Sequence, residues 1–62
     1  MENVTITMQL DEAKASALAE FVKRCGWSEW RQNAVDDDEA YRMKAAFAVL
    51  QKALSEAGFS PR

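Results

Sequence analysis

The chain has 62 residues, one cysteine and no histidine, and its eight Lys and Arg against ten Asp and Glu give a formal net charge of −2. One cysteine excludes an internal disulfide, one cysteine without histidine excludes a structural zinc site, and scattered cations disfavour direct nucleic-acid binding. A domain this short buries only about 60% of its unfolded surface, so we expect association or unusually good helix packing to supply stability.

The chain shows no signal peptide and no apolar run long enough to cross a bilayer, which predicts a cytoplasmic protein with no membrane partner. It offers no histidine for acid–base work and little concave volume for a substrate. We therefore expect no enzyme, no catalytic residue, no cofactor and no metal. The expected fold is one mostly α domain over residues 1–62, with a short N-terminal strand followed by a compact three-helix domain.

Residues 4–10 alternate strictly between apolar and polar side chains, which is typical of a half-buried strand. The apolar set is Val4, Ile6, Met8 and Leu10, and the polar set is Thr5, Thr7 and Gln9. No second strand is evident in the sequence, and a lone strand leaves its backbone groups unpaired. The strand could pair with its own copy in a homodimer, pair with a partner protein, or pack as an extended arm.

A first helix is predicted over about 12–25, with Asp11 as its N-cap and Gly26 as its end. Its apolar face is Ala17, Leu18, Phe21, Val22 and Cys25. Because Cys25 lies on this face, a buried inert thiol is expected there rather than a nucleophile.

A second, short helix is predicted over about 29–34, with Ser28 as its N-cap. Trp27 and Trp30 flank its start. The two tryptophans could fill the junction of the three helices, or one of them could lie in a binding interface, where tryptophan is a common energetic anchor.

A third helix is predicted over about 37–57, because a start signal, a period and a stop signal agree. Asp36 can form a capping box with Glu39, each side chain accepting from the backbone N–H of the other. Gly58 suits the left-handed position after the helix, and Phe59 and Pro61 follow it. The apolar stripe is Ala40, Met43, Phe47, Leu50 and Leu54, with Ala46 and Ala53 beside it. The predicted core of the whole domain is Ile6, Met8, Leu10, Leu18, Phe21, Val22, Trp30, Met43, Phe47, Leu50 and Leu54.

Four consecutive carboxylates, residues 36–39, precede and open the third helix. They lack the alternate spacing and the glycine of an EF-hand loop, so calcium binding is not expected. Capping and the positive end of the helix dipole account for acidic residues at this position. The alternative is an acidic patch that imitates a phosphate backbone or meets an Arg-rich partner, and one surface could serve both roles.

The segment Val4 to Trp30 resembles the opening of ribbon-helix-helix DNA-binding proteins: an alternating strand, an immediate cap, a helix ending in Lys-Arg-x-Gly, and a second helix start. That resemblance implies a two-stranded ribbon between two chains, with Thr5, Thr7 and Gln9 facing the bases. The strand's polar face lacks Lys and Arg, and the acidic run interrupts the second helix. Both features disfavour DNA binding and leave a ribbon-type dimer open.

The run Trp27 to Asp36, continuing through Glu39-Ala40-Tyr41 and closing on Ala57 to Arg62, resembles small proteins of bacteriophages, prophages and mobile elements. Some small acidic proteins of such elements are anti-CRISPR inhibitors that occlude a DNA-binding surface. The resemblance implies a non-enzymatic inhibitor, a possible DNA mimic, that binds a host protein or ribonucleoprotein complex through a basic groove. The expected partner-binding residues are Trp27, Glu29, Asp36, Asp37, Asp38 and Glu39.

Overall fold

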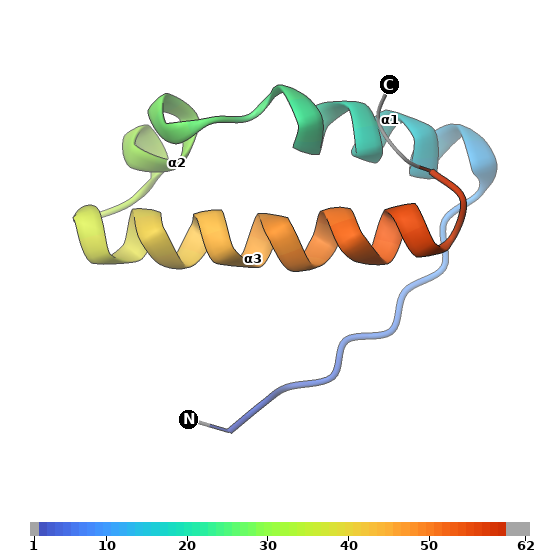
Figure 1. The fold of residues 1–62 in the computed structure, drawn as a ribbon, viewed down its shortest axis with the longest axis horizontal. Coiled ribbons are helices and arrows are strands. Elements are labelled where there is room, and N and C mark those ends of the chain that lie inside the picture. Colours follow the sequence, from blue (N-terminus) through green and yellow to red (C-terminus); the bar gives the residue numbers. More distant parts are fainter. Residues whose placement is uncertain (1, 60–62) are drawn as a thin grey trace.

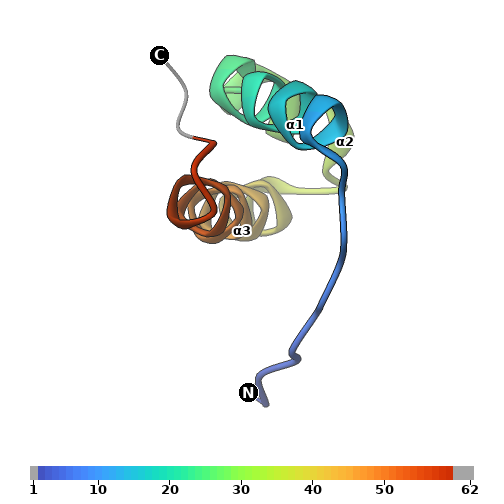
Figure 2. The same cartoon turned by 90° about the vertical axis from the view of Figure 1, so that its right-hand side faces the viewer.

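A computed structural model describes residues 2–59, in which an extended arm precedes three helices. The helices are α1 (Glu12–Arg24), α2 (Trp27–Asn33) and α3 (Asp37–Glu56). α1 and α2 lie in line and cover one side of α3, which runs antiparallel to both (Figure 1). The helices form two layers (Figure 2). α1 and α2, with 13 and 7 residues, together have as many residues as α3, which has 20.

Capping by Asp11 starts α1 as predicted, since the backbone N–H of Lys14 donates to Asp11 Oδ1 over 2.8 Å. The helix ends at Arg24, and Cys25 is already extended and half-buried. The buried face of α1 agrees with the predicted one only in part: Val22 is buried and Leu18 packs on the core, but the other buried residues are Ala15 and Ala19. Small alanine side chains at a helix–helix contact permit a close approach of the two helices.

The start of α2 differs from the prediction, because the helix begins at Trp27 and Ser28 is not its cap. Gly26 takes the N-cap position, and its backbone N–H donates to the Glu29 Oε1 atom over 2.6 Å. A glutamate at the third helical position thus satisfies the backbone ahead of the helix, which moves the start two residues earlier than predicted.

Both ends of α3 carry the predicted signals. The Glu39 N–H donates to Asp36 Oδ1 over 2.9 Å, but the Glu39 carboxylate reaches back to the N–H of Val35 rather than Asp36. At the other end Gly58 has a φ of 97°, the N–H of Phe59 donates to the Leu54 carbonyl and that of Gly58 to the Ser55 carbonyl. These two bonds make a Schellman motif. The predicted contribution of Pro61 lies outside the described residues.

The core is small and lies between α1 and α3. Its buried cluster is Ala19, Val22 and Leu54, with Leu18, Phe47, Leu50 and Phe59 packed against it. Burial of Val22 and Leu54 is confirmed, whereas Phe21 is 57% exposed; its ring is tilted by 56° to that of Phe47, with centroids 6.2 Å apart. Trp30 and Met43 are half-buried.

The predicted strand over residues 4–10 is absent from the structure of residues 2–59, and so is the predicted burial of Ile6, Met8 and Leu10. The arm is extended, but no other segment lies beside it to complete a ladder, and a strand is defined by such pairing. Figure 2 shows the arm leaving the start of α1 and continuing past α3, clear of both helix layers. Ile6 is 81% exposed as a result.

Candidate functional site

The acidic run forms an exposed corner where α2 turns into α3, and most of its carboxylates have structural partners. Asp36 caps α3, and Glu39 accepts from the backbone of Val35 over 2.9 Å. Asp37 accepts from Arg31 Nε over 2.6 Å, and a second nitrogen of Arg31 donates to the Ala34 carbonyl. Within residues 2–59 the Asp38 side chain has no hydrogen bond or ion pair, so its charge is the one most available to a partner.

Glu29, the fifth predicted acidic residue, is directed elsewhere. Its carboxylate accepts a hydrogen bond from the backbone N–H of Gly26 at the beginning of α2, whereas residues 36–39 follow the end of that helix. The predicted acidic set is therefore divided between the two ends of α2, and only residues 36–39 form one cluster.

An exposed aromatic pair joins α2 to α3 near the acidic corner. The rings of Trp27 and Tyr41 have centroids 4.8 Å apart at an interplanar angle of 46°, and the residues are 41% and 60% exposed. Tyr41 lies one helical turn after Asp37 and Asp38, so carboxylates and aromatic faces share this part of the surface. Trp27 was predicted as a partner-binding residue. Tyr41 was not, although its spacing from the acidic run was visible in the sequence.

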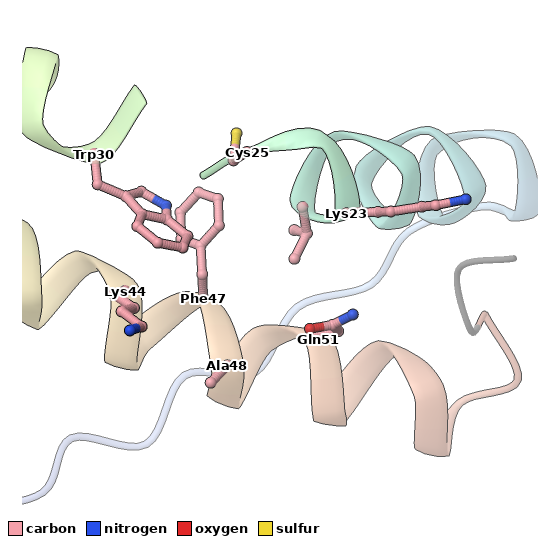
Figure 3. A pocket seen from close by; sticks show the side chains of 8 residues that line it. Lys23, Cys25, Trp30, Lys44, Phe47, Ala48 and Gln51 are labelled. Atoms are coloured by element: carbon pink, nitrogen blue, oxygen red, sulfur yellow. The ribbon is translucent and has the colours of Figure 1, made fainter. Parts of the chain in front are cut away.

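The other tryptophan belongs to a small hollow between the layers. Trp30, Phe47 and Cys25 line it, and its volume is about 250 Å³. Figure 3 shows the Trp30 indole nitrogen beside the Phe47 ring and the Cys25 sulfur turned away from both. Within residues 2–59 the buried Trp30 Nε1 has no hydrogen-bond partner. Its ring meets Phe47 edge-on at 5.7 Å and 74°, a geometry that allows a weak N–H···π contact.

Few polar side chains line that hollow. Its lining includes the amine-bearing Lys23 and Lys44 and the amide of Gln51, but no carboxylate from the described part of the chain. The side chains of the two lysines extend in different directions from the Trp30–Phe47 pair (Figure 3). No group of three or more potential metal ligands gathers anywhere in residues 2–59. Nor does any helix of the described chain have the length and apolarity needed to cross a membrane.

A much larger apolar groove separates the N-terminal arm from α3. Its volume is about 780 Å³, and every residue that lines it is apolar. The arm contributes Ile6, Met8 and Leu10, and α3 contributes Val49 among others. Val49 is 71% exposed, so this side of α3 has no cover within the described chain. Val49 was not among the predicted core or site residues, although Ala46, Val49 and Ala53 repeat at helical spacing.

The fold and these surfaces define a small three-helix protein with an exposed apolar arm and an acidic, aromatic corner. The chain belongs to a family of unknown function, DUF7706, which matches residues 1–62. No curated protein and no solved structure matches it.

Proposed function

We propose that this chain is a non-enzymatic binding protein whose acidic corner engages a basic surface on a partner that handles nucleic acid. The observation that carries the proposal is the exposed Trp27–Tyr41 pair, whose Tyr41 lies one helical turn after the carboxylates of Asp37 and Asp38. Tyrosine and tryptophan are the residue types that most often anchor protein interfaces, and here they lie uncovered. In this proposal the chain acts as an inhibitor by occupying the surface that would otherwise hold phosphates, as an anti-CRISPR protein does.

The chemistry of the corner favours arginine on the partner. A guanidinium group can stack on an aromatic face and donate two parallel hydrogen bonds to a carboxylate. Asp38 has no partner within residues 2–59 and can accept such a bond without losing a contact of its own. Arg-rich grooves that hold a nucleic-acid backbone present this group in quantity, which is the reason for proposing a partner of that class.

Affinity purification from a bacterial lysate tests the proposal with paired variants. Asp38→Asn and Trp27→Ala remove one charge and one aromatic anchor, and Glu12→Gln removes an exposed charge from the first turn of α1 as the matched control. We expect a host protein or ribonucleoprotein that elutes at raised salt, is retained by the control, and is lost with Trp27→Ala and weakened with Asp38→Asn. Equal recovery with all three variants would exclude the corner as the binding surface.

A dimeric ribbon-helix-helix-like DNA-binding regulator is the second candidate. It is favoured by the extended arm, which leads directly into the Asp11-capped α1 and whose backbone has no hydrogen-bond partner within residues 2–59. In this case residues 4–10 of two chains pair, and Thr5, Thr7 and Gln9 face the bases. The candidate predicts slow amide exchange over residues 4–10 and a DNA gel shift that weakens as salt rises. Fast exchange in the arm would exclude it.

A further inference from the structure

The chain exposes more surface than a folded protein of its size requires. Its accessible surface is 5294 Å². A compact monomer of 7.0 kDa is expected to expose about 4,000 Å². The excess of roughly 1,250 Å² exceeds the ~800 Å² that each partner buries in a typical stable interface. The radius of gyration, 12.5 Å, is likewise above the ~10.6 Å expected for 62 residues.

The arm and the uncovered side of α3 both contribute apolar surface to this total. Ile6 and Val49, on the two walls of the groove, are 81% and 71% exposed. The groove has a volume of about 780 Å³ and apolar walls. Contact between apolar surface and water is unfavourable, so covering these walls would stabilise the protein. The arm and this side of α3 therefore need an apolar occupant.

Charges on the same side of α3 indicate which occupant fits. Arg42, Val49 and Glu56 follow one another at seven-residue steps, or about two helical turns, so they lie in one row. Neither Arg42 nor Glu56 makes a side-chain hydrogen bond or ion pair within residues 2–59. If two copies of α3 pack antiparallel about Val49, Arg42 of each copy meets Glu56 of the other. The charges in this row of one α3 are thus complementary to those in the same row of a second, antiparallel copy.

We infer that a second copy of this chain covers the groove, with the two α3 helices antiparallel about Val49 and each arm closing over the other subunit. A two-fold axis produces this arrangement, because one surface then serves as both partners. Ala46 and Ala53, one turn on either side of Val49, are small enough to let the two helix backbones approach closely. The inference concerns the groove and is independent of what the acidic corner binds.

Sizing with light scattering over a hundredfold range of protein concentration tests the dimer directly. We expect a mass twice the 7.0 kDa of one chain that falls toward one chain on dilution. A single chain at every concentration would overturn the inference, and so would a trimer or larger assembly.

Two matched valine substitutions then locate the interface. Val49→Lys places a charge in the groove, and Val35→Lys makes the same change at an 82% exposed valine outside it. We expect Val49→Lys to weaken dimerisation by on the order of 100-fold or more and Val35→Lys to leave it unchanged. Circular dichroism of both variants checks that the helices remain. A folded Val49→Lys variant with unchanged dimerisation would overturn the inference.

A charge swap tests the antiparallel register. Arg42→Glu and Glu56→Arg each place like charges opposite one another in the proposed dimer, and the double variant restores opposite charges. Because residues 42 and 56 are about 21 Å apart along one helix, no contact within a single chain can produce the rescue. We expect each single variant to weaken the dimer severalfold and the double variant to recover it at low salt. A double variant weaker than both singles would overturn the register.

Discussion

Two sides of α3 are apolar, and neighbouring elements cover only one of them. On the covered side Leu54 is 7% exposed and packs with Ala19 and Val22 of α1, and it also borders the groove. On the open side Val49 is 71% exposed and faces the groove. A helix with one solvent-facing side normally carries polar residues on that side. Apolar residues on both sides therefore indicate that two different surfaces pack against this helix. The covered side holds the chain together, and the open side is where we propose assembly.

The sharpest way to separate the two sides is to truncate one side chain on each. Leu54→Ala removes a buried side chain and leaves a cavity, so we expect the free energy of unfolding to fall by about 2–5 kcal/mol at any protein concentration. In a domain of this size that loss is large enough to reduce helix content in water. Urea denaturation followed by circular dichroism measures it.

Val49→Ala is the matched control on the open side. At concentrations where the chain is a monomer we expect a change within about 0.5 kcal/mol, because Val49 contacts little there. Its cost should grow only where dimers form. A loss equal to that of Leu54→Ala in the monomer would contradict the distinction between the two sides.

Local signals in the sequence were sufficient to locate α3, because its start and end depend on residues within one turn. Asp36 and Gly58 act on backbone groups three or four positions away, and both have the predicted roles. The strand over residues 4–10 could not be decided in the same way. Alternation shows which side chains share a face, but a ladder requires a second segment, and the described chain provides none.

The buried face of α1 was predicted only in part, because periodicity gives weight to large side chains. Leu18 and Phe21 belong to the predicted apolar face, yet two of the three buried residues of α1 are Ala15 and Ala19. How closely two helices approach is a property of the pair. The acidic run was predicted both to start α3 and to form a binding patch. The hydrogen bonds of Asp36 and Glu39 at the start of α3 confirm the first role. The binding patch stays a prediction.

The C-terminal turn of α3 lies where the two sides meet, since Phe59 both packs on the core and lines the groove. Gly58→Ala should destabilise the fold by about 1–2 kcal/mol, because a φ of 97° is strained for any residue with a Cβ. Among the described residues, chain neighbours aside, no atom lies within 4 Å of the added carbon, so the cost is conformational rather than a clash. Lys52→Ala, at an exposed position, is the control in the same urea titration.

At the opposite end of α3, two substitutions of one residue separate capping from charge. Asp36→Ala should cost about 1 kcal/mol of stability, since the N–H of Glu39 loses its acceptor. Asp36→Asn keeps an acceptor oxygen and should stay within a few tenths of a kcal/mol of the original. Both changes remove the charge. A partner bound through charge at this residue should therefore be lost with both variants, whereas a purely structural role should leave the Asn variant unaffected.

The ion pair between Arg31 and Asp37 links the end of α2 to the first residue of α3. Of the interactions considered, we expect it to contribute least to the free energy of unfolding. The two side chains are 44% and 70% exposed and meet over 2.6 Å. An exposed ion pair contributes about 0–1 kcal/mol, and salt reduces that further. Asp37→Asn should thus shift the urea midpoint slightly at low salt and not at all in 0.5 M NaCl. A large shift that persists in salt would mean that the Arg31 bond to the Ala34 carbonyl depends on Asp37, and that the α2–α3 turn is held more tightly than the exposure of the pair implies.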